Sequence, residues 1–289
     1  MVYNLRINDT GNDNTMIDLH SHILPALCDG SQNLETSLEM ARIAVADGTT
    51  HLACTPHIYP GIYPNSTDTI LPALHHLQAA LDEHAIPLTL VIGADVHMVP
   101  EVMSGLRQGS IPTLHGSRYF LLEPSHHVAV PNFVEKVENF INAGYVPLIT
   151  HPERLHWLEE HYAEFVAAAH SGAWIQITAG SINGEFGSRA KKWSERMLQD
   201  GIVHIIASDA HGIKQRRPAM SAGVIEAIRL TDDEAEISRM VQDRPQAVLD
   251  NRCPTTVAKP PGLAHPVVST ALLQHAAPPK RSLLQRLFA

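Results

Sequence analysis

The chain has few of the residues that hold small secreted domains together or anchor proteins in membranes. Its 289 residues include only three cysteines, Cys28, Cys54 and Cys253, which are too few and too scattered for a disulfide framework or a structural zinc knuckle. It contains no uncharged apolar run of roughly 18 residues, so we expect no membrane span. Positions 1–15 lack the apolar stretch of a secretory signal. We therefore expect a cytoplasmic protein in a reducing compartment.

The charge balance is acidic, and one residue type is unusually common. The 21 Lys and Arg are outnumbered by 30 Asp and Glu, giving a formal net charge of -9. Without a basic stripe, this balance argues against nucleic acid as the main partner. The 19 histidines nearly equal the basic residues in number. Because histidine is the commonest metal ligand, the positions of these 19 histidines indicate whether the chain could bind metal ions.

From residue 16 onward, short apolar runs alternate with longer helical patterns. The expected strands are 17–19, 50–54, 88–93, 119–122, 146–150, 174–177 and 203–207. The expected helices are 34–47, 69–84, 99–108, 132–143, 155–170 and 189–200. Strands that each precede a helix predict a parallel sheet covered by helices. With this many units, a closed or nearly closed α/β barrel is favoured over a doubly wound sheet, which the pattern alone leaves open.

The two ends of the chain differ in character from the middle. Residues 1–15 are polar and predict a disordered leader. From residue 254, Pro, Ala and Ser become frequent and the periodicity weakens, which predicts a flexible tail over 254–289. One domain is therefore expected over residues 16–253.

Metal-ligand residue types follow six of the seven expected strands. They are His20 and His22, His57, Asp95, Glu123, His151, and Asp209 with His211. The C-terminal strand ends of an α/β barrel form one rim, so these side chains should converge. Mixed nitrogen and oxygen donors suit Zn, Mn or Fe better than Ca or Mg. More than four ligands exceed one tetrahedral site and indicate two or three metal ions.

Other polar residues near these positions have plainer explanations. A single histidine at a strand end is more often hydrogen-bonded than metal-bound. Asp29 and Glu153 could each be a loop or cap residue, since Asp29 precedes a glycine and fits a turn. His126, His127 and His156 follow ligand-bearing strands and could line a substrate cleft.

Several motifs in order along the chain resemble one known family. They are Met-Ile-Asp-Leu-His-Ser-His-Ile-Leu-Pro from Met16, Asp29-Gly30, Thr55-Pro56-His57, Leu122-Glu123-Pro124, Thr150-His151-Pro152-Glu153-Arg154, Ala207-Ser208-Asp209-Ala210-His211 and Arg217-Pro218. Together they resemble the polymerase and histidinol phosphatase (PHP) superfamily, in particular its bacterial tyrosine-phosphatase branch of the CpsB/CapC/YwqE type. The resemblance covers residues 16–251.

This resemblance implies a distorted (β/α)7 barrel that holds two to three divalent metal ions, with manganese first and iron or zinc as alternatives. Carried over position by position, the first metal is held by His20, His22 and Asp209, the second by Glu123 and His151, and the third by Asp29, His57 and His211, while Asp95 bridges the first and second. The family usually has glutamate in place of Asp95. The shorter aspartate implies altered metal spacing or occupancy.

The resemblance also implies a reaction and its catalytic residues. Arg154 and Arg217 would clamp the phosphoryl oxygens, for which bidentate guanidinium groups are suited, and Asp209 would be the catalytic carboxylate. The implied activity is hydrolysis of phosphotyrosine by direct attack of metal-bound hydroxide. The implied substrate is the tail of a bacterial tyrosine kinase in capsule or exopolysaccharide synthesis, and a homo-oligomer is compatible with the sequence.

Two other functions remain open at this stage. One is a small-molecule phosphoesterase resembling histidinol phosphatase, and the other is a non-catalytic metal-binding regulatory module. Cysteine-based phosphatase chemistry is excluded, because it needs an arginine six residues after the cysteine. Here those positions hold Leu34, Pro60 and Lys259.

Overall fold

The computed structural model describes residues 15–264, and within them nine strands form two parallel sheets. One sheet has the order β1-β2-β4, and the other has the order β3-β5-β6-β7-β8-β9. The strands are β1 Met16–Ser21, β2 Thr49–Cys54, β3 His57–Ile58, β4 Thr89–Ile92, β5 Asp95–His97, β6 Tyr119–Glu123, β7 Val146–Thr150, β8 Trp174–Thr178 and β9 Ile205–Ala207. All the pairs are parallel, as expected for strands joined through helices.

The two sheets are parts of one ring. Cys54 pairs with Ile92 in the first sheet, and three residues further on His57 pairs with Asp95 in the second. The register therefore continues, so β2 with β3 and β4 with β5 are each a single interrupted strand. Nine strands minus these two interruptions leave seven strand positions among the described residues.

Hydrogen bonds between the first and last strand positions close the ring. The backbone N–H of Asp209 donates to the carbonyl of His20 (2.9 Å), and that of His22 donates to the carbonyl of Ala210 (2.8 Å). Ser21 and Ala210 form a parallel bridge beside them. The prediction of a distorted (β/α)7 barrel is thus confirmed.

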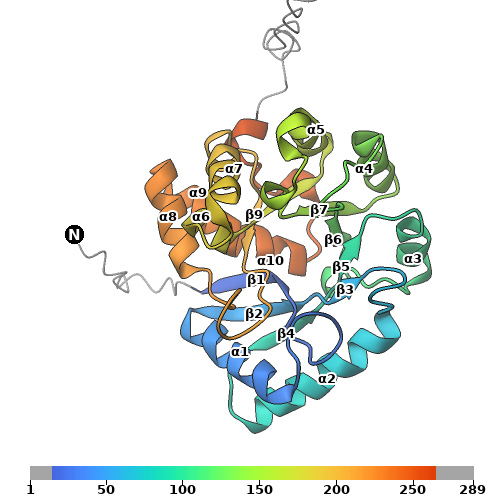
Figure 1. Cartoon of the computed structure of the whole chain (residues 1–289), viewed down its shortest axis with the longest axis vertical. Helices are drawn as coiled ribbons and strands as arrows, with labels where there is room; N and C mark the ends of the chain where they lie inside the picture. Colours follow the sequence, from blue (N-terminus) through green and yellow to red (C-terminus); the bar gives the residue numbers. More distant parts are fainter. Residues whose placement is uncertain (1–14, 265–289) are drawn as a thin grey trace, which may run out of the picture.

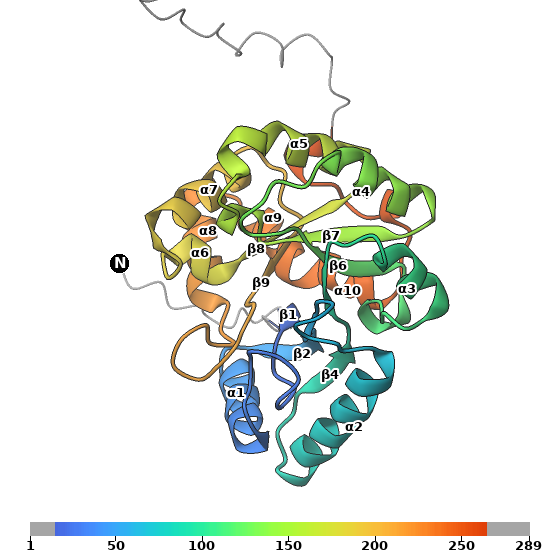
Figure 2. The ribbon, with the colours of Figure 1, turned by 45° about the vertical axis from the view of Figure 1, so that its right-hand side comes forward.

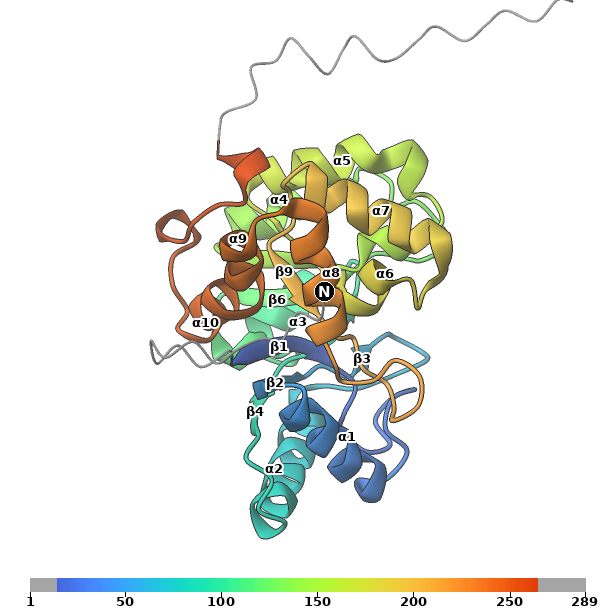
Figure 3. The same ribbon diagram turned by 90° about the vertical axis from the view of Figure 1, so that its left-hand side faces the viewer.

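Helices surround the ring (Figure 1). They are α1 Leu34–Ala46, α2 Thr67–Glu83, α3 Val102–Gln108, α4 Phe133–Asn142, α5 Leu158–Ser171, α6 Ala179–Asn183, α7 Gly187–Gln199, α8 Ser221–Thr231, α9 Glu234–Ser238 and α10 Arg244–Leu249. Helices α1 and α2 cover the β1-β2-β4 side, while α4, α5 and α7 lie on the opposite side, over β6 to β9 (Figure 2). Helix α10 lies beside β1 (Figure 3). No described helix is both long enough and apolar enough to cross a bilayer.

The alternation of side chains along each strand separates the outer core from the barrel interior. On β6, Phe120 and Leu122 belong to the cluster packed under the helices, whereas Tyr119 and Leu121 belong to an inner cluster. The inner cluster takes residues from every strand position: Ile17, Leu19, Ala53, Val91, Tyr119, Leu121, Val146, Leu148, Trp174, Ile205 and Ala207. Because the strand period is two, the next inward residue on β6 is Glu123, at the open end of the barrel.

The domain extends further than the predicted boundary at residue 253. Pro254–Thr256 and Pro261–Leu263 form short 3-10 turns. The N–H of Gly262 donates to the carbonyl of Gly201 (3.0 Å), and the carbonyl of Ala258 accepts from Arg244 (2.9 Å). These backbone contacts hold residues 254–264 against the barrel despite their loop-like composition. The rest of the predicted tail, 265–289, and residues 1–14 of the predicted leader lie outside the described residues.

Candidate active site

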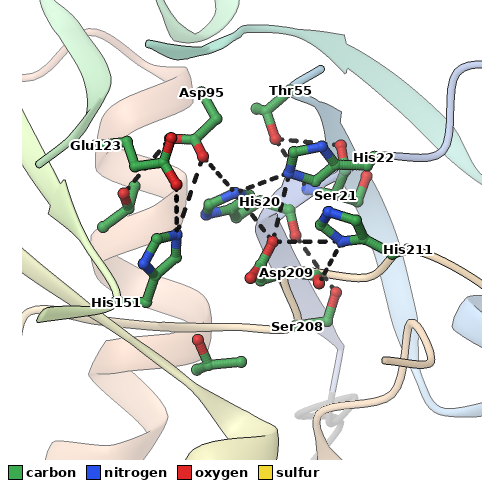
Figure 4. A network of polar contacts seen from close by, with 12 residues as sticks. His20, Ser21, His22, Thr55, Asp95, Glu123, His151, Ser208, Asp209 and His211 are labelled. Carbon is green, nitrogen blue, oxygen red and sulfur yellow. Dashed lines mark hydrogen bonds and ion pairs between the residues drawn. The ribbon is translucent and has the colours of Figure 1, made fainter. Parts of the chain in front are cut away.

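Imidazoles and carboxylates gather at the C-terminal ends of the strands (Figure 4). All nine predicted metal ligands lie in this one cluster: His20, His22, Asp29, His57, Asp95, Glu123, His151, Asp209 and His211. Five overlapping groups of three or four of these residues, one of them including His126, place their ligand atoms within 4.8 Å of one another.

Asp209 lies on one side of the cluster and faces three imidazoles through one carboxylate oxygen. Its Oδ1 is 3.3 Å from Nε2 of His20 and 3.4 Å from Nε2 of His22. The same oxygen is 3.6 Å from Nδ1 of His211. The carboxylate is buried, and within the described residues Oδ1 has no hydrogen-bond partner. This oxygen therefore has the surroundings of a metal ligand.

Asp95 occupies the centre, where the predicted bridge should be. Its Oδ2 is 3.3 Å from Nδ1 of His57, 3.5 Å from Nε2 of His20 and 3.9 Å from Nε2 of His151. The carboxylate is completely buried. The shorter aspartate side chain therefore still reaches the imidazoles on both sides.

Four imidazoles surround Glu123. Its Oε2 is 3.5 Å from Nδ1 of His57 and 3.6 Å from Nδ1 of His97. Its Oε1 is 3.3 Å from Nε2 of His126 and 3.8 Å from Nε2 of His151. Burial would raise the pKa of this carboxyl, but the surrounding imidazoles lower it to about 2.

Asp29 forms the outer edge of the cluster. Its Oδ1 is 3.4 Å from Nε2 of His211, 3.5 Å from Nε2 of His57 and 4.0 Å from Nδ1 of His22. The side chain is 46% exposed, the most open of the predicted ligands. Although burial opposes it, His211 and the other imidazoles hold the pKa of this carboxyl below its usual range.

The donor atoms fit divalent metal ions. Buried atoms without a hydrogen-bond partner in the described chain include Oδ2 of Asp95, Oδ1 of Asp209, Nδ1 of His57 and Nε2 of His211. Buried polar atoms rarely stay unpaired, and here nitrogen and oxygen atoms face one another at distances too long for good hydrogen bonds. Mixed imidazole and carboxylate sets of this kind bind Zn, Mn or Fe.

Side chains behind the cluster orient two of the histidines. Oε1 of Gln176 lies 2.9 Å from Nδ1 of His20, and Sγ of Cys28 lies 3.2 Å from Nδ1 of His22. In both cases the outer nitrogen is occupied and Nε2 points into the site, as is usual for metal-binding histidines. Gln176 and Cys28 were not among the predicted site residues, because a polar partner has no fixed spacing from the histidine it supports.

Two arginines approach the other oxygen of Asp209, and one of them is not the predicted one. Arg154 donates to Oδ2 of Asp209, as does Nη2 of Arg216 at 2.5 Å. Arg217 is exposed and pairs with no carboxylate in residues 15–264. The assignment of Arg217 is therefore corrected to Arg216. Burial would raise the pKa of Asp209, but His20 and both arginines hold it well below its usual range.

The backbone of the last loop explains which arginine turns inward. Arg216 has a φ of 48°, and its carbonyl accepts from the N–H groups of His211 (2.8 Å) and Gly212 (3.3 Å). This closes a tight loop with the Arg216 side chain on the inside. His151 (φ 34°) and Asp209 (φ 49°) also have left-handed backbones. Such strain in non-glycine residues tends to gather at functional sites.

Of the remaining candidates, Glu153 supports the site from behind, and His127 and His156 lie at its rim. Glu153 is buried, and its Oε1 accepts from the N–H of Thr178 (2.9 Å) and the hydroxyl of Ser181 (2.8 Å), which ties it to the start of α6. His127 and His156 pair at the rim, 3.1 Å apart through their Nδ1 atoms.

His97, beside Glu123, was not among the predicted site residues. The available signal was Asp95-Val96-His97, which repeats the Asp-x-His spacing of Asp209 and His211.

A closed parallel barrel whose rim gathers nine imidazole and carboxylate side chains beside two guanidinium groups is typical of a metal-dependent hydrolase. The family model described as "Capsular polysaccharide synthesis, CpsB/CapC" matches residues 16–250. The chain belongs to this CpsB/CapC family, as its motifs predicted.

Two similar proteins support this family membership. The chain is 34% identical over 250 residues to the tyrosine-protein phosphatase YwqE of Bacillus subtilis (strain 168), a match that covers 85% of this chain and 95% of that protein. It is 30% identical over 203 residues to the putative tyrosine-protein phosphatase CapC of Staphylococcus aureus, covering 70% of this chain and 79% of CapC.

A solved structure agrees with the fold. It is one of the crystal structures of YwqE from Bacillus subtilis and CpsB from Streptococcus pneumoniae, which are described as unique metal-dependent tyrosine phosphatases. It has 31% sequence identity and a TM-score of 0.76, covering 82% of this chain and 96% of that one.

Proposed function

We propose that this protein is a metal-dependent protein-tyrosine phosphatase. The observation that carries this conclusion is the divided environment of Asp209. One carboxylate oxygen faces the imidazoles of His20 and His22, and the other faces the guanidinium groups of Arg154 and Arg216. A cation site and an anion site therefore meet at one buried residue, which is the arrangement that a phosphate ester requires. The relatives named as tyrosine-protein phosphatases support the same activity.

The ligand groups support a centre of two to three metals, for which we propose manganese first and iron or zinc as alternatives. The proposed sets are His20, His22 and Asp209 for the first metal, Glu123 and His151 for the second, and Asp29, His57 and His211 for the third, with Asp95 between the first and second. His57 contacts Asp95 through Nδ1 and Asp29 through Nε2, so it stands between two of these sets. When bound, such metals lower the pKa of coordinated water and neutralise charge on the phosphoryl group.

The arginines bind and orient the phosphoryl group. The Arg216 side chain is 27% exposed while its Nη2 stays on Asp209, so the N–H groups on its exposed side can donate to a phosphoryl oxygen. Guanidinium groups suit this task because they donate in pairs to tetrahedral oxyanions.

The leaving group is a phenol with a pKa of about 10, which departs with little help from an acid. We propose that the imidazole of His126, 29% exposed beside Glu123, gives the departing oxygen a proton.

The proposed substrate is a phosphotyrosine protein, and within the capsule system of this family we propose a bacterial tyrosine kinase with phosphorylated tyrosines. We place the reaction in the cytoplasm, where that kinase domain and its phosphotyrosines would be found.

The test compares substrates on the metal-loaded chain. A phosphotyrosine peptide, a phosphoserine peptide and histidinol phosphate are supplied at equal concentration with Mn, Fe or Zn. We expect the phosphotyrosine peptide to be hydrolysed with much the highest kcat/KM, and Asp209→Asn to abolish turnover. A clear preference for histidinol phosphate, or full activity of the Asp209→Asn variant, would overturn the proposal.

A further inference from the structure

The aromatic ring of Phe186 lies against both arginines of the site. The centroid of the ring is 4.4 Å from Cζ of Arg154 and 5.8 Å from Cζ of Arg216. Phe186 precedes α7 and is partly exposed. One ring therefore contacts two guanidinium groups that come from distant parts of the chain.

The local backbone is built to place this ring. Gly184 and Gly187 flank Phe186 with φ values of 94° and 85°, a conformation that glycine adopts readily. A Cβ added at Gly180 would lie 2.9 Å from Cε2 of the ring, so the absence of a side chain at Gly180 leaves room for Phe186. The N–H of Glu185 donates to the carbonyl of Gly180 (2.8 Å), which holds the turn against α6.

The same helix is tied to the segment that carries Arg154. The Glu153 carboxylate bonds to Thr178 and Ser181 at the start of α6. Glu153 thus fixes the backbone next to Arg154, and Phe186 fixes its guanidinium end.

The ring of Phe186 stabilises two guanidinium groups that would otherwise repel each other. Arg154 and Arg216 carry like charges and converge on one oxygen of Asp209. Each would lose part of that attraction once the carboxylate also bound a metal. An aromatic face attracts cations without adding charge that would compete with a phosphate. It can therefore keep both guanidinium groups in place while they exchange partners.

We propose that Phe186 is a positioning residue that holds Arg154 and Arg216 in readiness for the phosphoryl group. This inference rests on the proposed function, because it takes the two arginines as the phosphate-binding groups. It concerns the phosphoryl group and not the substrate ring, so its effect should be the same for all phosphate ligands.

The test measures phosphate binding with and without the ring. The full chain, loaded with Mn, is prepared as wild type, Phe186→Leu, Phe186→Tyr and Trp193→Leu. Trp193 is a matched control, since it is an aromatic residue of α7 that contacts a cation, Lys192, at 5.7 Å. Calorimetry gives the Kd for inorganic phosphate, kinetics give KM and kcat for p-nitrophenyl phosphate and a phosphotyrosine peptide, and metal analysis checks the load.

We expect Phe186→Leu to weaken phosphate binding about tenfold, equivalent to about 1.4 kcal/mol. KM should rise by a similar factor for both substrates, with metal content unchanged. Phe186→Tyr keeps the ring and should restore wild-type binding, and Trp193→Leu should leave it unaltered. Gly180→Ala, which pushes on the ring without removing it, should weaken phosphate binding in the same direction.

Two results would overturn the inference: an unchanged phosphate Kd in Phe186→Leu, or a loss confined to the phosphotyrosine peptide. The second result would assign the ring to the substrate side chain. If the wild type bound phosphate but failed to hydrolyse the peptide, the proposed function would fail, while calorimetry would still decide the role of Phe186.

Discussion

Replacing each of the two neighbouring arginines separately tests the site most directly. The family resemblance implied Arg217, whereas the structure places Arg216 against Asp209 and leaves Arg217 exposed. Arg216→Ala removes the bond to Asp209 and, with it, the pair of N–H donors that the guanidinium offers to the phosphoryl group. Each hydrogen bond to a charged group contributes about 1.5–3 kcal/mol. Because the Arg216 side chain is 27% exposed, we take the lower value for each of two bonds.

The expected loss is then about 3 kcal/mol, or on the order of a hundredfold in kcat/KM. Arg217→Ala should stay close to wild type and serves as the matched control. Arg216→Lys keeps the charge but not the planar pair of donors, so it should fall between the two. Initial rates on a phosphotyrosine peptide, with metal content measured for every variant, provide the comparison. If Arg217→Ala lost as much activity as Arg216→Ala, the assignment would be refuted.

Three further predictions concern the metal centre, a residue that orients one of its ligands, and a helix cap. Stripping the metals with a chelator should abolish hydrolysis and lower the melting temperature, since ligands present at about 1,000 times their Kd stabilise a fold by about 4 kcal/mol; an unchanged melting curve and rate would contradict a metal centre. Gln176→Leu removes the partner of Nδ1 of His20 and should weaken metal binding about 10- to 100-fold, as measured by competition with a chromogenic chelator. Unchanged metal affinity would show that this contact does not orient His20. Asp47 caps α8 by accepting from the N–H groups of Met220 (2.6 Å) and Ser221 (3.0 Å). Asp47→Ala should therefore lower the free energy of unfolding, measured by urea titration, by about 1–2 kcal/mol and leave kcat normal. Asp47→Asn keeps an acceptor and should lose less stability.

Much of the ligand set could be read from the sequence because parallel strands impose a simple geometry. Inward residues recur every second position, and all C-terminal strand ends meet at one rim. Glu123 after Tyr119 and Leu121, and Asp209 after Ile205 and Ala207, follow from this rule alone. His20-Ser21-His22 was recognisable for its spacing, and the family motifs supplied Asp29, which no strand pattern predicts.

The loops obey no such rule, and there the tertiary structure decided. Which of two adjacent arginines turns inward depends on the left-handed backbone of Arg216 and on the hydrogen bonds that its carbonyl accepts. The ring of Phe186 reaches the site because Gly180, on another turn, has no side chain. Residues 254–264 look like a tail by composition, yet the carbonyl of Ala258 meets Arg244. Local sequence determined the strands and the ligands at their ends, since these depend on short-range periodicity. Contacts between segments far apart in the chain determined the arginine pair, its aromatic support and the end of the domain.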